Sequence, residues 1–287
     1  MKKIKLVMSD IDGTLINSDH KVSDRTKEAV HKLINSGVEF GIATGRNYES
    51  AVGIVKQLEL DPKTIPIVSL NGYWVDHPEL NYEFRDVTMD YETSKKLGEI
   101  GADFYMGVLY FFDDKVYSHM DELSLKDYEF SKGSGHMHFF KDGHTMERIE
   151  SIEEIKHVFT PDHKLLKIVF VQDEDYTELV KERISRNFPE EYDVLMVGRG
   201  WAEIMPKAVN KGKAILDYAK SRGLDYTEIL AFGDSDNDLT MINYLGTGIA
   251  MKNARNSLKV LANDITDSNN DDGVAKYLEK HLLNSIS

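Results

Sequence analysis

Short apolar runs alternate with amphipathic stretches in both terminal parts of the chain. Residues 3–9 form an apolar run with β-branched side chains that stops at Asp10, which predicts a buried strand. The stretch after Ser23 carries its apolar residues on one helical face and stops at Gly37, which predicts a helix with an N-cap. Alternation at this spacing predicts a parallel sheet with crossover helices. Further strands are predicted at 38–43, 65–70, 228–232 and 247–251, and further helices after Arg46, at 211–222 and at 273–283.

The middle of the chain has a different pattern. Two apolar runs, 108–112 and 115–119, flank Asp113 and Asp114, which is typical of a β-hairpin. Antiparallel strands mixed with helices predict an α+β unit. We therefore predict an α/β fold, in which a doubly wound, parallel-sheet (Rossmann-like) core carries an inserted α+β unit. The other elements predicted in the insertion are a strand at 165–172, a helix at about 175–188 and a strand at 192–197.

The charge distribution supports an insertion. The 287 residues include 49 Asp+Glu and 35 Lys+Arg, for a formal net charge of −14. Residues 83–198 hold 26 acidic and 14 basic side chains, whereas the rest of the chain holds 23 and 21. We therefore expect the core at 1–82 and 199–287 and the inserted unit at 83–198. The excess of acids also argues against a nucleic-acid partner, because phosphate contacts need basic side chains.

Cysteine usage and hydropathy narrow the class of protein further. The chain has no cysteine, which excludes disulfides, thiolate metal sites and thiol nucleophiles. The apolar run near the N-terminus is short and ends at Asp10, so it does not have the pattern of a signal peptide. No run approaches the roughly 18 apolar residues of a membrane span. We expect a cytoplasmic protein with no membrane contact.

Polar side chains follow the predicted strands or begin a predicted helix. In an open α/β sheet, the carboxyl ends of the strands line the crevice where ligands bind, so we expect these side chains to meet. Two carboxylates about 4 Å apart repel by about 4 kcal/mol at an effective dielectric of about 20. Four acids with one lysine would take up protons unless a divalent cation neutralised them, and all-oxygen ligation indicates Mg²⁺. The side chains are Asp10, Asp12, Thr44, Lys211, Asp234 and Asp238.

This set of groups is suited to phosphoryl transfer. A carboxylate beside Mg²⁺ can attack phosphorus and form an acyl phosphate. A second carboxylate two residues away can give a proton to the leaving group and then take one from water. Thr44 and Lys211 are suited to hold the phosphoryl oxygens.

Four segments resemble, in order, the motifs of the haloacid dehalogenase superfamily of phosphatases. The tail segments 249–254 and 270–275 are similar to the Cof-type sugar-phosphatase branch. The resemblance covers essentially the whole chain and implies that the insertion is a mobile cap domain that chooses the substrate. The four segments are Asp10-Ile11-Asp12-Gly13-Thr14-Leu15, Thr44-Gly45-Arg46, Lys211-Gly212 and Gly233-Asp234-Ser235-Asp236-Asn237-Asp238.

The resemblance implies roles for individual residues. Asp10 would be the nucleophile and Asp12 the general acid/base, while Thr44 and Lys211 would hold the phosphoryl group. Mg²⁺ would be bound by Asp10, the backbone carbonyl of Asp12 and Asp234, with Asp238 supporting the metal shell or Lys211. The residues expected to line the substrate site are Gly45, Arg46, Asn71, Gly72 and Asn237.

We therefore expect a Mg²⁺-dependent phosphatase that hydrolyses small phosphorylated metabolites through an aspartyl phosphate. Sugar phosphates are the first candidates, followed by phosphorylated cofactors. Tyr73 follows Asn71-Gly72 where family members often have a small residue, so its ring is expected to narrow the space for the leaving group.

Two alternatives use the same residues. A phosphomutase of the same superfamily would return the phosphoryl group to a sugar. A non-enzymatic phospho-acceptor module, such as a receiver domain, also uses Asp, Thr and Lys on a parallel sheet, but receivers are shorter and have no large insertion.

Two other kinds of metal site are less well supported by the sequence than a magnesium site. A calcium loop starting at Asp234 would need Gly and Glu where the chain has Leu239 and Leu245. The histidines between His136 and His144 have no matching carboxylates, so we interpret that stretch as a surface loop.

Overall fold

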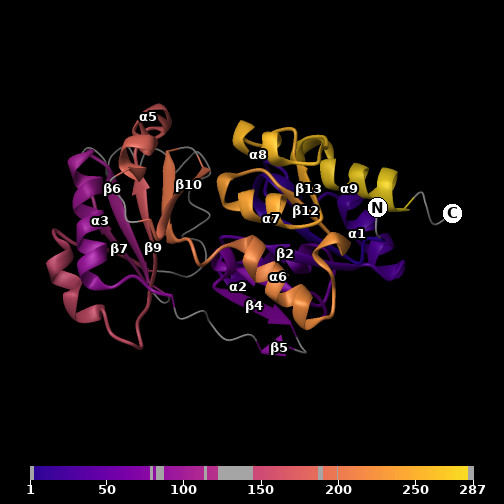
Figure 1. Ribbon diagram of the computed structural model, residues 1–287, viewed down its shortest axis with the longest axis horizontal. Helices are drawn as coiled ribbons and strands as arrows, with labels where there is room; N and C mark the ends of the chain where they lie inside the picture. The colour runs from indigo at the N-terminus through magenta and orange to yellow at the C-terminus, as the bar shows by residue number, and fades with distance from the viewer. Residues whose placement is uncertain are drawn as a thin grey trace. The chain divides into compact units, whose positions relative to one another are not determined.

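The computed structural model describes residues 3–77, 80–81, 87–112, 115–121, 145–186, 190–198 and 200–283. The chain divides into two compact units (Figure 1). Unit 1 comprises Met1–Arg85 and Val209–Ser287, and unit 2 comprises Asp86–Ala208. The stretch from His136 to His144, interpreted above as a surface loop, lies outside the described residues. No helix in the described part of the chain has the length and apolar character needed to cross a membrane.

Unit 1 is built on a mostly parallel sheet. From β14 to β3 each strand runs parallel to its neighbour, and β4 and β5 then add in antiparallel fashion. Every residue of β1 and β12 is buried, which requires cover on both faces of the sheet. The order is β14 (Asp264–Ile265), β13 (Thr247–Ala250), β12 (Ile229–Gly233), β1 (Leu6–Ser9), β2 (Glu39–Ala43), β3 (Ile67–Ser69), β4 (Trp74–His77) and β5 (Leu80–Asn81).

Several helices of unit 1 begin at side-chain caps that the sequence supplies. Ser23 accepts a hydrogen bond from the backbone N–H of Thr26, as predicted, and starts α1 (Asp24–Asn35). Helix α1 packs against α9 (Gly273–Leu278), and α6 (Lys211–Ser221) packs against α7 (Leu239–Tyr244). The other helices are α2 (Tyr48–Gln57), α8 (Asn256–Leu261) and the short turns η1 (Ile11–Leu15), η2 (Pro62–Thr64), η3 (Leu70–Gly72), η7 (Tyr226–Glu228), η8 (Asp236–Asp238), η9 (Asn269–Asp271) and η10 (Glu279–Leu283).

Unit 2 is an α+β unit with its own sheet. The predicted hairpin is present, with Val108 opposite His119 in an antiparallel pair. Apolar side chains of α3 (Tyr91–Asp103) and η6 (Ile152–Val158) share one core with this sheet. The strands, in sheet order, are β10 (Tyr192–Gly198), β11 (Trp201–Pro206), β9 (Leu165–Val171), β6 (Gly107–Phe112), β7 (Lys115–His119) and β8 (Thr145–Arg148), and a further helix is α5 (Glu174–Ser185).

The boundary between the units differs from the one expected from composition. The expected second boundary, at residue 198, falls before β11, but β11 pairs with β9 and β10 and so belongs to unit 2. The reason is that charge marked the insertion, whereas Trp201–Pro206 is a fully buried strand with a single acid at Glu203.

Candidate active site

The middle of the unit 1 sheet brings two acidic strand ends together. Strand β1 lies between β2 and β12, so the strand order reverses beside it, which is the switch point where open α/β sheets bind ligands. Ser9 lies opposite Phe232 in the parallel pair, and the backbone N–H of Asp10 donates to the carbonyl of Phe232 at 3.0 Å. Asp10 follows β1 and Asp234 follows β12, so both leave the same edge of the sheet.

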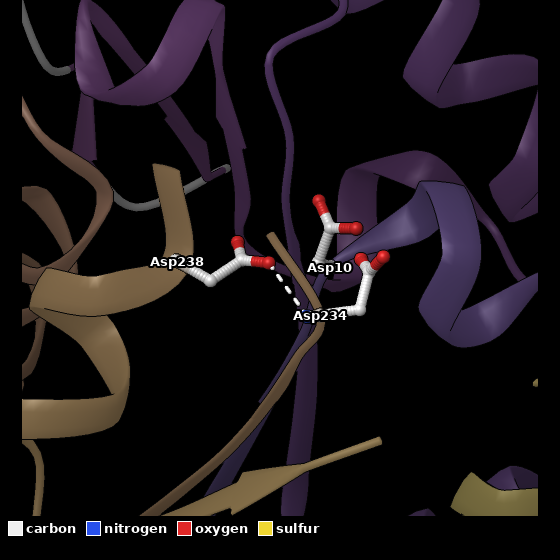
Figure 2. A group of neighbouring side chains, drawn as sticks. All are labelled: Asp10, Asp234 and Asp238. Atoms are coloured by element: carbon white, nitrogen blue, oxygen red, sulfur yellow. Dashed lines mark hydrogen bonds between the residues drawn. The ribbon is translucent and has the colours of Figure 1, made fainter. Parts of the chain in front are cut away.

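Three carboxylates converge at this edge. One carboxylate oxygen from each of Asp10, Asp234 and Asp238 lies within 4.8 Å of the others, and Figure 2 shows the three side chains close together. Asp238 Oδ2 accepts hydrogen bonds from the backbone N–H groups of Asp234 (2.9 Å) and Ser235 (3.1 Å). These bonds close the turn after β12, so the backbone holds Asp238 in place.

A buried ammonium joins two of the carboxylates. Lys211 Nζ lies 2.7 Å from Asp10 Oδ1 and 2.7 Å from Asp238 Oδ1. The lysine is the first residue of α6, and its side chain is 0% exposed. Asp238, which was expected to support the metal shell or Lys211, is bound to Lys211 in the structure.

Burial and the neighbouring acids shift the pKa values of these groups. Burial raises the pKa of Asp10 to about 8. The positive charge of Lys211 lowers this pKa only in part, and the negative charges of Asp238 and Asp12 raise it further. Burial also raises the pKa of Asp234 well above its ordinary value, with Asp10 and Asp238 adding to the effect. Burial lowers the pKa of Lys211, but Asp10 and Asp238 more than offset this and leave it above its ordinary value. Clustered oxygen donors with too little cationic charge fit Mg²⁺.

The turn after β1 depends on a glycine. Gly13 has φ +71°, and a Cβ there would lie 2.4 Å from Asp234 Oδ2. Next to it, the Thr14 hydroxyl donates to Asp234 Oδ1 at 3.2 Å. The side-chain amide of Asn253, from the Cof-like tail segment, donates to the Gly13 carbonyl at 2.7 Å. The tail segment thus fixes the turn that carries Asp12, a positioning contact that motif spacing alone did not indicate.

The side chain of Asp12 points to a different partner from those of the other acids. Arg46 Nε donates to Asp12 Oδ2 at 2.8 Å, and Arg46 Nη2 donates to Asp12 Oδ1 at 2.6 Å. We expected Arg46 to line the substrate site, and in the structure its guanidinium is bound to the second aspartate of the first motif. This ion pair was not predicted from the sequence, because the two residues lie 34 positions apart and only the fold brings them together.

The remaining expected residues gather where β2 and β3 end. Thr44 follows β2 and is 1% exposed, and its carbonyl accepts a hydrogen bond from the backbone N–H of Asn71 at 2.9 Å. Asn71 Oδ1 in turn accepts from Asn237 Nδ2 at 3.0 Å, which links this edge to the turn after β12. A Cβ on Gly45 would lie 3.1 Å from Asn71 Oδ1, so Gly45 leaves room for that amide.

The residues after β3 are tightly packed against α6. Gly72 has φ +105°, and a Cβ there would lie 2.6 Å from the carbonyl of Asn210, which precedes α6. Tyr73 is 1% exposed. Its effect on the leaving-group space stays a prediction.

Comparison with known proteins identifies the family. A sequence profile described as haloacid dehalogenase-like hydrolase matches residues 7–278. The chain belongs to this family. The resemblance to the Cof-type branch, the α/β fold and the expectation of a phosphoric monoester hydrolase are thereby confirmed.

Relatives match over nearly the whole length of this haloacid dehalogenase-like hydrolase. The 5-amino-6-(5-phospho-D-ribitylamino)uracil phosphatase YitU of Bacillus subtilis is 29% identical over 281 residues, which cover 96% of this chain and 97% of YitU. A second 5-amino-6-(5-phospho-D-ribitylamino)uracil phosphatase of Bacillus subtilis, YwtE, is 29% identical, and the match covers 97% of this chain and 98% of YwtE. A solved haloacid dehalogenase-like hydrolase from B. subtilis has a TM-score of 0.77 at 25% identity, covering 98% of this chain and 100% of that one.

Proposed function

We propose that this phosphatase is Mg²⁺-dependent and hydrolyses primary alkyl phosphates of small polyhydroxy metabolites through an aspartyl phosphate on Asp10. The observation that carries the proposal is the convergence of Asp10 and Asp234 at the switch point, with Lys211 Nζ 2.7 Å from Asp10 Oδ1. A phosphorylated substrate needs a nucleophile and positive charge at the same place, and this edge offers both.

In the first step, a carboxylate oxygen of Asp10 attacks phosphorus and the bond from phosphorus to the ester oxygen breaks. Asp12 gives a proton to that oxygen, so the organic part leaves as an alcohol. Lys211 keeps Asp10 oriented and neutralises charge on the phosphoryl oxygens, to which the Thr44 hydroxyl donates a hydrogen bond. Gly45, Asn71, Gly72 and Asn237 form the polar edge beside the phosphoryl group.

In the second step, water attacks phosphorus and the bond from phosphorus to the Asp10 oxygen breaks. Asp12, now a carboxylate, takes the proton from that water, and inorganic phosphate leaves. Both aspartates thereby return to their starting states, and the only net change is hydrolysis of the ester.

The carboxylates of Asp10 and Asp234 and the carbonyl of Asp12 would hold Mg²⁺, with Asp238 supporting them. When bound, the ion would neutralise the clustered acids and draw charge from the phosphoryl group. The raised pKa values of Asp10 and Asp234 support this assignment, because burial and the neighbouring acids disfavour their charged forms until a cation balances them.

The substrate class is supported by the named relatives. YitU and YwtE are named for an ester in which the phosphate is carried by a ribityl chain. A ribityl phosphate and a hexose phosphate share an alkyl phosphate ester next to several hydroxyl groups, so we propose this class for the chain. Unit 2 occupies the place in the sequence where the resemblance puts the cap domain, and we propose that it is that domain.

Hydrolysis in ¹⁸O-labelled water tests the reaction. With a hexose phosphate and Mg²⁺, we expect one labelled oxygen in each released phosphate and no label in the alcohol. A phosphomutase would transfer the group to a second sugar without label in phosphate, and a phospho-acceptor module would retain a stable phosphoprotein. Either of those results would replace the proposed reaction.

Mg²⁺ should stabilise the protein more at pH 8 than at pH 5. The folded pKa of Asp10 is raised from 3.8 to about 8, so the metal-free folded state binds a proton that the unfolded state releases. Stability without metal should therefore fall as the pH rises from about 4 to about 8. Mg²⁺ at 100 times its dissociation constant should then add about 2.7 kcal/mol to the free energy of unfolding near pH 8.

Urea unfolding at both pH values, with and without Mg²⁺, measures this effect. Asp234→Asn should lose most of the Mg²⁺ stabilisation, whereas Asp24→Asn, at a side chain that is 95% exposed, should keep it. Equal Mg²⁺ stabilisation of the wild type and Asp234→Asn would place the ion elsewhere.

A further inference from the structure

The guanidinium of Arg46 is committed to the Asp12 carboxylate by a two-bond fork. The bonds are 2.8 Å from Nε to Oδ2 and 2.6 Å from Nη2 to Oδ1. The Arg46 side chain is only 10% exposed, whereas the Asp12 side chain is 43% exposed. The arginine side chain is thus largely buried, and the acid is the partner that is exposed to solvent.

Arg46 is itself held by the elements around it. Its Nη1 donates to the hydroxyl of Ser50 at 3.2 Å, and its backbone N–H donates to the hydroxyl of Thr44 at 3.1 Å. Ser50 is fixed in the first turn of α2, where its own N–H donates to the side chain of Asn47 at 3.0 Å. The backbone N–H of Leu70 donates to the Arg46 carbonyl at 2.8 Å. A strand end, a helix start and the turn after β3 therefore fix this arginine.

The acid of this pair is 43% exposed and partly screened by solvent, so charge attraction alone is not the main effect of the fork on Asp12. What a fork does provide is orientation, because two parallel N–H···O bonds fix the plane of a carboxylate. A group that alternately gives and takes a proton benefits from being held in one place.

We propose that Arg46 is a positioning residue that acts through Asp12. This proposal rests on the proposed function. When the Asp10 oxygen bonds to phosphorus and the ester bond breaks, the proton of Asp12 passes to the ester oxygen. The carboxylate so formed is the species that the guanidinium fork binds, and it stays oriented until it takes a proton from the attacking water. Arg46 thus stabilises the negative charge that Asp12 gains as it gives up its proton to the leaving group.

Arg46→Met separates this role from phosphate binding by means of two esters. An alkyl phosphate such as glucose 6-phosphate needs a proton on its leaving oxygen, whereas p-nitrophenyl phosphate does not. Because general acid–base catalysis contributes about 10²–10⁴-fold, we expect kcat/KM for the alkyl ester to fall at least about 10-fold. For p-nitrophenyl phosphate, kcat/KM should change by less than about threefold, since that parameter ends at nitrophenolate release.

A pre-steady-state measurement on the same variant adds an independent readout. Water attack on the aspartyl phosphate still needs Asp12 as the base, so Arg46→Met should release nitrophenolate in a burst before a slow steady state. Inhibition by inorganic phosphate should be unchanged, since Arg46 does not touch the phosphoryl group in this account.

Control variants make the result specific. Arg25→Met removes a fork of the same type, to Glu279 at 3.1 and 2.6 Å, and should leave both esters unaffected. Arg46→Lys should recover part of the alkyl ester activity, because a lysine keeps the charge without the fork. Asp12→Asn/Arg46→Met should be no slower than Asp12→Asn alone, because both changes remove one function. If Arg46→Met does not fold, Ser50→Ala loosens the arginine and should give a smaller shift in the same direction.

Three results of these experiments would contradict the role proposed for Arg46 or the proposed function. An equal fall in kcat/KM for both esters, with weaker inhibition by phosphate, would make Arg46 a phosphate-binding residue and overturn the proposal. Unchanged kinetics with both esters in Arg46→Met, or in Ser50→Ala if that variant replaces it, would overturn it as well. Failure of the proposed function looks different, because the wild type itself would then release no phosphate from either ester.

Discussion

Replacing Asp10 with asparagine should lower phosphate release from every phosphomonoester by at least about 10⁴-fold, because the amide cannot form the acyl phosphate. The substitution keeps the size of the side chain, and Lys211 Nζ, now 2.7 Å from Asp10 Oδ1, would still face an oxygen acceptor. The loss should therefore appear in kcat and not as unfolding. Steady-state release of phosphate, measured beside a thermal unfolding curve, checks both parts.

Asp24→Asn is the matched control for that substitution. Asp24 is an exposed acid at the start of α1, and its replacement should leave turnover unchanged. Hydrolysis by Asp10→Asn at a few per cent of the wild-type rate would exclude Asp10 as the nucleophile. The nucleophile would then have to be another group at the same edge.

Replacing Lys211 with methionine should damage stability and turnover together. The ammonium is 0% exposed and lies 2.7 Å from carboxylate oxygens of Asp10 and Asp238. Removing one partner of a buried ion pair costs about 3–5 kcal/mol, because the remaining charges stay buried without compensation. Turnover should also fall by about 10²–10³-fold, since a charge that stabilises the phosphoryl oxygens is lost. Urea unfolding and phosphate release measure the two effects.

A second substitution separates the two losses. Lys211→Met/Asp238→Asn removes a buried negative charge along with the positive one, so it should be more stable than Lys211→Met while its turnover stays as low. Lys213→Met, two residues further along α6 at an exposed position, should change neither property. If Lys211→Met unfolded like the wild type, the ammonium would have no part in balancing the buried acids.

The parallel core was predictable because its strands are read from local patterns. A strand buried on both faces needs a continuous apolar run, and such runs mark β1 and β12 in the sequence. The acids that follow them sit at carboxyl ends of neighbouring parallel strands, so the convergence of Asp10 and Asp234 follows from the sheet order. Local pattern and topology are enough for this part of the site.

Other features depend on contacts that no local pattern encodes. The fork from Arg46 to Asp12 joins the ends of two strands, and either residue alone fits a substrate-binding or surface role. The bond from Asn253 to the Gly13 carbonyl spans 240 positions. Strand β11 was assigned to the wrong unit because its partners, β9 and β10, determine its place and its composition does not. In each case a contact between residues far apart in the sequence determines the structure, and a short stretch of sequence does not predict such a contact.

Trapping the phosphorylated enzyme shows directly whether Asp10 is the nucleophile. The wild type is mixed with substrate and Mg²⁺, quenched in acid, reduced with borohydride, and digested for mass spectrometry. An aspartyl phosphate is reduced to homoserine, so we expect homoserine at position 10 and at no other aspartate. Homoserine at position 12 or 234, or steady phosphate release with no reduced aspartate at all, would contradict it.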